Sequence, residues 1–265
     1  MSARDWADLR RPEFEALDAK SAVAVLPTAA IEQHGPHLPV GTDAHIMEGM
    51  LARLRAACPA ELDLLILPVQ AVGKSNEHLD ARGTLTLSAA TALAAWTEVG
   101  LSVARAGVRR IACINSHGGN LDLVSILARE LRVRAGMLAV KAQWGSFGVP
   151  DGLYSERERA FGIHGGDLET SLMLLFRPET VDMGAARDFA SAAEGAAIPP
   201  VGPVSRGWIA SDLNPAGTVG EAHRATAEKG AATAEHQVRG FVELLRAMRA
   251  APLGGLAPVE GPPAR

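Results

Sequence analysis

The chain has 265 residues, of which 48% are hydrophobic, and its formal net charge is −4. This hydrophobic content can bury a sizeable core and excludes a disordered chain, while the small net charge gives no support for binding nucleic acid or an anionic membrane surface. The length fits one large domain or two small ones.

Cysteine usage and the N-terminal segment indicate the compartment. Cys58 and Cys113 are the two cysteines, and Cys113 lies in an apolar run, so we expect a reducing compartment rather than a disulfide framework. The opening residues MSARDWADLRRPEF lack the apolar segment of a signal peptide. Because no apolar run approaches the roughly 18 residues of a membrane span, we expect a cytoplasmic protein without a membrane contact.

Short apolar runs alternate with amphipathic stretches along the chain. Strands are predicted over 21–28, 62–70, 110–116 and 136–144, helices over 43–57, 88–107, 120–136, 166–179 and 221–248, and a loop over 192–205. Ser88 is a candidate N-cap for the second helix. The alternation predicts an α/β domain whose largely parallel sheet is covered on both faces. We find no domain boundary and expect a single domain over 1–249, followed by a flexible tail over 250–265.

Polar stretches follow the predicted strands. In open α/β sheets, ligands bind outside the carboxyl ends of the strands, so residues that follow strands are candidates for one shared site. Four stretches qualify, because each follows a strand or leads into a helix: PTAAIEQHGPHLPVGTDAH (27–45), GKSNEH (73–78), NSHGGN (115–120) and IHGGDLETS (163–171).

The first stretch carries Glu32, His34 and Asp43. Glu32 and His34 are two positions apart, so in extended backbone they point to the same side, and the intervening prolines and glycines can bring Asp43 back toward them. Carboxylate and imidazole together suit Zn, Mn, Fe or Co better than Ca or Mg. In the alternative interpretation, Asp43 merely N-caps the helix over 43–57 and the histidines are surface loop residues.

The third stretch carries His117 between small residues. Ser116, Gly118 and Gly119 would let a metal or a substrate approach the backbone closely. In the alternative interpretation, His117 caps and packs in an ordinary turn between a strand and a helix.

The fourth stretch carries His164 and Glu169. Glu169 falls in the first turn of a predicted helix, where the helix dipole favours negative charge, and the apolar residues after it suggest burial. A buried glutamate needs a partner. Asp167 fits an N-cap or first-turn acid. Glu77 and His78 of the second stretch are candidates to support the ligands from a loop.

Together these stretches resemble the creatininase family of metal-dependent amidohydrolases. The matching blocks occur in the family's order and span most of the chain from residue 22 to about 245: EQHGPHLPVGTD (32–43), GKSNEH with RGTLTLS (73–88), NSHGGN (115–120), HGGDLETS (164–171) and GTVGEAHRATAEKG (217–230). The resemblance implies a single three-layer α/β/α domain, a site for two divalent ions and a homo-oligomer, often a hexamer.

The resemblance also implies roles for individual residues. The metal ligands would be Glu32, His34, His117 and a bridging Asp43, with zinc as the first choice of metal and manganese or iron as alternatives. Such a pair of ions would activate a water molecule and polarise the scissile carbonyl. His164 matches a histidine that shuttles protons to the leaving nitrogen, and Ser75 matches a substrate-contacting serine.

Two departures from the creatinine-hydrolysing enzyme change the expected chemistry. That enzyme has Tyr and a ligand Glu where this chain has Gly118 and Gly119, which we place beside the substrate. We expect Glu169 to replace the missing ligand, or else to serve as general base. The creatinine enzyme also closes an aromatic lid just before the matching His164, where this chain has Ala160 followed by Phe161. Trp144 and Trp208 could form a replacement wall or simply pack in the core.

The insert over 144–163 carries Arg157, Glu158 and Arg159, which either shape the pocket or form a solvated loop. Because the ligand Glu and the aromatic lid of the creatinine enzyme are replaced in this chain, creatinine itself is not the expected substrate. We expect hydrolysis of a non-peptide C–N bond, in an amide, formamide or cyclic amide of a small molecule, by a metal-activated water.

Three alternatives remain open. Family branches with the same glycines include a formamide deformylase and a peptidase that trims a modified peptide during mycofactocin maturation, so a peptidase-like function is one alternative. A non-catalytic metal-binding oligomer or a lapsed enzyme is the second. A nucleotide-binding enzyme is the third, but no G-x-G-x-x-G or P-loop follows any predicted strand.

Overall fold

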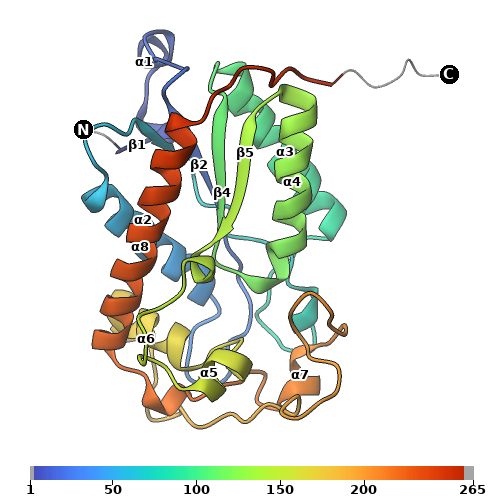
Figure 1. Cartoon of the computed structure of the whole chain (residues 1–265). Helices are drawn as coiled ribbons and strands as arrows, with labels where there is room; N and C mark the ends of the chain where they lie inside the picture. The colour runs from blue at the N-terminus through green and yellow to red at the C-terminus, as the bar shows by residue number, and fades with distance from the viewer. Residues whose placement is uncertain (1–2, 260–265) are drawn as a thin grey trace, which may run out of the picture.

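Five strands form one parallel sheet in the order β1-β3-β2-β4-β5 in the computed structural model, which describes residues 3–259 (Figure 1). The strands are β1 (Ala3–Asp5), β2 (Val23–Thr28), β3 (Leu64–Ile66), β4 (Arg110–Asn115) and β5 (Leu138–Gln143). The predicted α/β class and parallel sheet are therefore confirmed.

Helices cover both faces of this sheet. The long ones are α2 (Thr42–Ala57), α3 (Ala89–Arg105), α4 (Leu121–Ala135), α6 (Asp167–Phe176) and α8 (Ala227–Ala250), and the short ones are α1 (Arg11–Glu15), α5 (Glu156–Phe161) and α7 (Ala210–Leu213). Figure 1 shows α2 and α8 on one side of the sheet and α3 and α4 on the other.

The alternation of side chains along β2 explains the three layers. Val23 and Val25 pack against the face covered by α2, α6 and α8, whereas Ala24 and Leu26 pack against the face covered by α3 and α4. Successive residues of a strand point to opposite faces, so an apolar residue at every position requires helices on both sides.

Most predicted elements have the expected boundaries, with two corrections. The Ser88 side chain accepts a hydrogen bond from the Thr91 N–H at 3.2 Å and caps α3 as predicted. The strand predicted over 62–70 is shorter, because the segment after Ile66 runs into Pro68. The helix predicted from residue 221 begins at Ala227 with Thr226 as its N-cap, and Ala222–Arg224 forms a separate 3-10 turn.

The C-terminal segment after α8 contacts the body of the protein. Arg109 donates a hydrogen bond to the Leu256 carbonyl at 2.5 Å, and the Val259 N–H donates to the Val133 carbonyl at 2.8 Å. The remainder of the expected tail, residues 260–265, lies outside the described residues. Within residues 3–259, no helix is both long and apolar enough to cross a membrane.

The strand order places a crevice at the end of β2. β2 lies between β3 and β4, so the chain after β2 continues to the neighbour on one side, β3, and then crosses to the neighbour on the other side, β4. Ligand sites of open parallel sheets lie at such a point, outside the carboxyl ends of the strands. The segments after β2 and β4 meet there, and the Thr28 hydroxyl donates to the Asn115 side chain at 3.0 Å across the two strand ends.

Candidate metal centre

The loop between β2 and α2 brings Glu32, His34 and Asp43 together. Its sharp turn uses Gly35, which has φ +70°, and a Cβ there would lie 2.5 Å from the Thr218 side chain. The N-cap of α2 is Gly41, so Asp43 lies in the first turn of the helix and is not its cap. All three side chains are buried, which contradicts the alternative of solvated loop residues.

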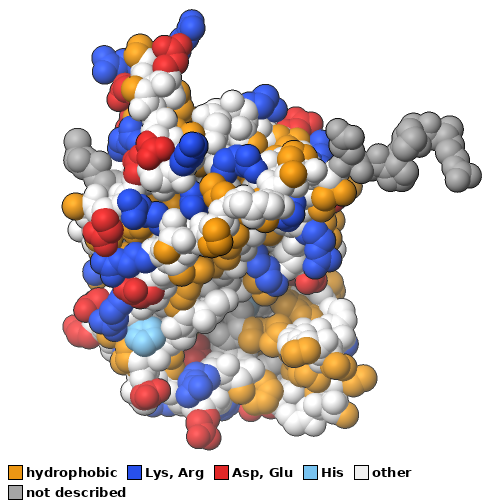
Figure 2. All heavy atoms as spheres, turned by 45° about the horizontal axis from the view of Figure 1, so that its top comes forward, with side chains coloured by type: hydrophobic (Ala, Val, Ile, Leu, Met, Phe, Trp, Pro, Cys, Tyr) orange, Lys and Arg blue, Asp and Glu red, His pale blue; other side chains and the backbone are white. Residues whose placement is uncertain are grey.

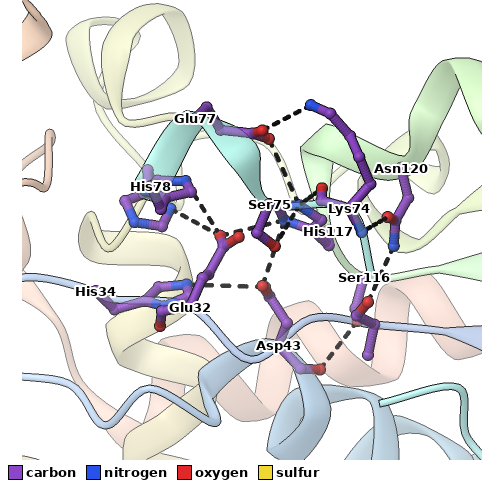
Figure 3. Close-up of polar contacts among 12 residues, drawn as sticks. Glu32, His34, Asp43, Lys74, Ser75, Glu77, His78, Ser116, His117 and Asn120 are labelled. Atoms are coloured by element: carbon purple, nitrogen blue, oxygen red, sulfur yellow. Dashed lines mark hydrogen bonds and ion pairs between the residues drawn. The ribbon is translucent and has the colours of Figure 1, made fainter. Parts of the chain in front are cut away.

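Acids and histidines from separate segments point toward one another here (Figure 3). His117, at the end of β4, places Nδ1 3.2 Å from Glu32 Oε1 and 3.4 Å from Asp43 Oδ2. His34 Nε2 lies 3.8 Å from Asp43 Oδ1 and 3.9 Å from Glu169 Oε2. Three groups of these residues have ligand atoms close enough to share an ion, and Asp43 belongs to two of them, Glu32–Asp43–His117 and His34–Asp43–Glu169; the third is Glu32–His34–His164.

Backbone carbonyls set which nitrogen of each histidine faces these acids. His34 Nδ1 donates to the Glu32 carbonyl at 3.0 Å, and His117 Nε2 donates to the Lys74 carbonyl at 2.9 Å. A carbonyl only accepts, so these nitrogens carry protons, and in the neutral form of each ring the opposite nitrogen holds a lone pair on the side of the carboxylates. Burial opposes protonation of His117, but Glu32 and Asp43 raise its pKa well above its ordinary value, so a metal ion would take the place of a proton there. This arrangement is typical of metal-ligating histidines.

Unsatisfied polar atoms concentrate in the same place. Among residues 3–259, seven buried side-chain nitrogens or oxygens lack a hydrogen-bond partner, and four of them are both carboxylate oxygens of Glu32, Nε2 of His34 and Oδ2 of Asp43. An unsatisfied buried polar group is costly. In each of the two groups the ligand atoms lie within 4.8 Å of one another, so a divalent ion fits the donor set and would satisfy these atoms.

The acids also lack the positive charge that would let all of them ionise. Burial, together with the Glu32 charge, raises the pKa of Asp43 to about 7, and burial with the Asp43 charge raises the pKa of Glu169 to about 8. Burial opposes ionisation of Glu32 as well, but His117, His164 and His34 hold its pKa well below its ordinary value. Bound cations would supply the missing charge.

The 163–171 segment closes the site from the side of α6. Glu169 Oε2 accepts a hydrogen bond from the Gly165 N–H at 2.6 Å while facing His34. His164 Nε2 donates to the Gln33 carbonyl at 2.8 Å, and its Nδ1 lies 3.5 Å from Glu32 Oε1. Both residues therefore lie where the sequence predicts them, beside the strand-end ligands.

Gly119 lies where no side chain would fit. A Cβ there would approach Glu77 Oε1 to 2.0 Å and the Lys74 carbonyl to 2.7 Å, whereas a Cβ on Gly118 would meet nothing within 4 Å. Both glycines line the cavity beside the site. Ser75 is fully buried, and its hydroxyl lies 3.3 Å from His117 Nε2, so it contacts a candidate ligand rather than the cavity.

A cavity of about 400 Å³ opens onto this cluster. Its outer wall is the segment around Pro200 to Trp208, and Figure 2 shows a hollow in the surface bordered by hydrophobic side chains. Trp208 contributes to the wall, whereas Trp144 packs on Phe241 in the core, so only one of the two candidate tryptophans lines the cavity. A hollow of about 470 Å³ between α2 and α6 contains none of the clustered acids.

The charged insert contacts the backbone of segments next to the site rather than the cavity. The buried Glu158 carboxylate accepts hydrogen bonds from the N–H groups of Leu168, at 3.2 Å, and Glu221, at 2.7 Å. Arg157 instead pairs at the surface with Asp188 and Glu194. The pocket-shaping role expected of this charge run is therefore indirect.

Sequence reasoning missed one residue of the site and left two others as supporting candidates. Gln33 was not singled out, although it lies between two candidate ligands and its amide contacts His78 at 2.9 Å. His78 places Nε2 3.3 Å from Glu32 Oε1, and Glu77 pairs with Lys74 at 2.6 Å. The position of Gln33 between Glu32 and His34 was the one available signal.

Comparisons with known proteins agree with this geometry. The family model described as "Creatininase: Creatinine amidohydrolase" matches residues 7–245. The mycofactocin precursor peptide peptidase of Mycolicibacterium smegmatis is 30% identical over 161 residues, which span 60% of this chain and 60% of that protein. The protein of the same name from Mycobacterium ulcerans is 31% identical over 215 residues, 78% of this chain and 77% of that one. The creatinine amidohydrolase of Pseudomonas putida is 29% identical over 258 residues, 90% of this chain and 95% of that one.

Solved structures match over nearly the whole chain. A structure named "Creatininase Mn" has a TM-score of 0.76 and 24% identity, and covers 94% of this chain and 100% of its own. A creatininase variant described as "Zn-Zn type" has a TM-score of 0.75 and 25% identity, and covers 95% and 100%. Creatininase structures thus carry manganese or zinc, and this chain has buried clusters of His, Glu and Asp that could bind metal.

Proposed function

The chain belongs to the creatininase family, and on that premise we propose that it is a metal-dependent hydrolase of amide-type C–N bonds. The observation that carries the proposal is the pair of acid–histidine groups that share Asp43 and contain four buried atoms without a hydrogen-bond partner. A structural cluster would satisfy its own polar atoms, whereas this one leaves them for a ligand.

Two divalent ions would be held by this donor set. One would lie among Glu32, Asp43 and His117, and the other among His34, Asp43 and Glu169. Ions bound there lower the pKa of a water molecule and polarise a carbonyl oxygen. We keep zinc as the first choice of metal with manganese or iron as alternatives, and a homo-oligomer in the cytoplasm as the expected state.

The chain's own residues would handle the proton. In hydrolysis, a C–O bond forms from water to the carbonyl carbon, the C–N bond breaks, and a proton of the water ends on the leaving nitrogen. His164 can carry this proton, because its Nε2 is committed to the Gln33 carbonyl while Nδ1 keeps a lone pair facing Glu32. Glu169 has a pKa raised to about 8 by burial and could share the transfer when it is not a ligand.

The border of the cavity favours a substrate that carries an apolar group. Leu121 and Val201 line it although they are 41% and 43% exposed, and Arg206 lines it from the same segment as Val201. An apolar border suits a substrate with an apolar group attached to the scissile amide. This border and the similarity to mycofactocin precursor peptide peptidases favour a peptidase-like function on a modified peptide as the second candidate.

Elemental analysis and hydrolysis assays on wild type and Asp43→Asn test the proposal. Protein purified without chelator is assayed with creatinine, formanilide and a short apolar peptide amide. We expect bound zinc, manganese or iron in wild type, turnover of an amide probe other than creatinine, and loss of both metal and turnover in the variant, because Asp43 belongs to both groups.

Asp122→Asn is the matched control, because Asp122 is exposed at the cavity and lies outside the cluster. It should keep wild-type metal content. Full metal and full turnover in Asp43→Asn would contradict the proposal, and so would a wild type that binds none of these metals after reconstitution.

A further inference from the structure

Four histidines surround Glu32, and His78 differs from the other three in its hydrogen bonding. His34, His117 and His164 each donate to a backbone carbonyl, at 3.0, 2.9 and 2.8 Å, so in the neutral ring the nitrogen on the side of the carboxylates is the one without a proton. The nitrogen of His78 that points away from Glu32, Nδ1, instead faces the side-chain amide nitrogen of Gln33 at 2.9 Å.

The backbone fixes the orientation of the Gln33 amide at both ends. The Gly35 N–H, which can only donate, lies 3.0 Å from Gln33 Oε1, and the Gly217 carbonyl, which can only accept, lies 2.5 Å from Nε2. A flipped amide would set donor against donor and acceptor against acceptor. Thr84 adds a further constraint, because its hydroxyl accepts from the Gln33 N–H and donates to the His78 carbonyl, both at 3.1 Å.

This fixed amide determines where the proton of His78 lies. One hydrogen of Gln33 Nε2 goes to Gly217, and two ring nitrogens lie near the other: His78 Nδ1 at 2.9 Å and His164 Nε2 at 3.4 Å. His164 Nε2 is itself the donor to the Gln33 carbonyl, so the nearer nitrogen, His78 Nδ1, is the one that accepts. Neutral His78 then carries its proton on Nε2, which faces Glu32 Oε1 at 3.3 Å (Figure 3). The orientation of the Gln33 amide is thus the observation that assigns this tautomer.

The neighbouring ring has the opposite character. His164 donates its Nε2 proton to the Gln33 carbonyl and presents the lone pair of Nδ1 to the same oxygen of Glu32, at 3.5 Å. The two rings stack with centroids 4.2 Å apart. An N–H and a lone pair thus lie side by side at one carboxylate oxygen, and residue 33 sets both, through its side chain for His78 and its backbone for His164.

We propose that Gln33 is a positioning residue that keeps the proton of His78 on Nε2, the nitrogen on the side of Glu32, and leaves His164 as the proton acceptor. The chemical meaning rests on the proposed function, since amide hydrolysis needs one group that takes a proton from water and another that donates toward the oxygen or nitrogen of the substrate. A neutral imidazole can do either, so a hydrogen-bond partner must decide between them. A purely packing role for Gln33 would leave the tautomer of His78 undetermined.

The test is a ¹⁵N-histidine NMR spectrum of the metal-free full chain, in which long-range ¹H–¹⁵N correlations separate protonated from unprotonated ring nitrogens. His78→Asn and His164→Asn variants assign the signals. In wild type we expect His78 and His164 both protonated on Nε2. In Gln33→Glu, an acceptor replaces the donor facing Nδ1, so His78 should become predominantly Nδ1–H. His164 should stay Nε2–H, because its Nε2 donates to the Gln33 carbonyl at 2.8 Å and the new carboxylate, in place of the amide 3.4 Å away, would also accept from it.

Two further variants keep the result decisive. Gln33→Met removes the donor without adding an acceptor or a charge, so His78 should become a mixture of the two tautomers. Gln70→Glu is the matched control for the added charge, because the Gln70 amide bonds the Pro68 carbonyl at 3.0 Å. It should leave the spectra of both histidines unchanged.

The proposal is overturned if wild-type His78 is protonated on Nδ1, or if both Gln33 variants keep the wild-type tautomer. The wild-type spectrum alone decides the first point even if Gln33→Glu does not fold. The measurement needs neither metal nor substrate, so a protein that hydrolyses nothing but shows these tautomers would contradict the proposed function and leave the role of Gln33 intact.

Discussion

Two groups of buried acids meet at the first turn of α6 and differ in how their oxygens are satisfied. Glu169 faces His34, in a cluster where both oxygens of Glu32 and one of Asp43 have no hydrogen-bond partner. Asp167, two residues earlier, accepts from the Ser171 hydroxyl at 3.0 Å and pairs with Lys229 at 2.5 Å. Asp167 is buried and so are Glu32, His34 and Asp43, while the Glu169 side chain is 21% exposed, so burial alone does not distinguish a candidate site from a structural ion pair. The unsatisfied oxygens do.

The largest expected effect comes from Glu169→Gln, which changes the unsatisfied group. Metal content should fall from about two ions to about one, and turnover should fall by at least about 100-fold. Substituting a residue that only supports a metal ligand already lowers metal affinity or activity by about 10–100-fold, and Glu169 would be a ligand itself. Elemental analysis and hydrolysis assays measure both. Glu48→Gln, on the exposed face of α2, is the control. Unchanged metal with lost turnover would make Glu169 a general base instead.

Lys229→Met tests the satisfied group. Removing the lysine leaves Asp167 buried without its cation, and such a loss costs about 3–5 kcal/mol when the pair is fully buried. Lys229 is 20% exposed, so we expect the free energy of unfolding to fall by about 2–3 kcal/mol. Urea unfolding measures the change, with the exposed Lys141→Met as control. Metal content should be unchanged, and a loss of metal here would erase the distinction between the two groups.

The pH dependence of zinc binding tests whether the acids of the unsatisfied group, Asp43 and Glu169, hold protons until a metal ion binds. Without metal, burial raises the pKa of Asp43 to about 7 and of Glu169 to about 8, so below these values the ion must displace protons. Affinity should therefore rise with pH, by about tenfold per pH unit for each proton displaced, and level off above about pH 8. Calorimetry in two buffers of different ionisation enthalpy counts the protons. A flat affinity from pH 6 to 8 would mean that both acids are already ionised.

Arg157→Ala should have the smallest effect. Arg157 pairs with Asp188 and Glu194, each at 2.8 Å, but at the protein surface, where ion pairs contribute about 0–1 kcal/mol. Thermal unfolding at low and high salt measures the difference in stability between wild type and variant, which should shrink as salt screens the ion pairs. A cost well above 1 kcal/mol would show that the insert supports the buried acids more strongly than its exposure suggests.

The sequence allowed much of the fold and of the candidate ligand set to be predicted. Glu32, His34 and His117 follow strands made mostly of apolar residues, and the ends of parallel strands share one edge of the sheet, so their ligand chemistry and their position pointed to the same place. Glu169 could be placed nearby because a glutamate within an apolar helix needs a partner.

Other features depend on contacts that no local pattern encodes. The Gln33 amide is oriented by the Gly217 carbonyl, 184 positions away in sequence. The loop predicted over 192–205 gave no sign of reaching the cavity, although residues from Pro200 to Trp208 form its wall. β1 has only three residues, too few to show an alternating pattern. In each case the decisive partner comes from a distant segment.

The space around Gly119 has a consequence for how the protein holds together. Because no side chain fits there, the candidate second ion relies on Glu169 of α6 and His34 from the loop after β2. These two residues are 135 positions apart in the sequence. An ion at that position would therefore act as a non-covalent cross-link between the sheet edge and the α6–α8 layer. Its binding free energy would add to the free energy of unfolding, so metal supply would set the resistance of this layer to local opening as well as the chemistry beside it.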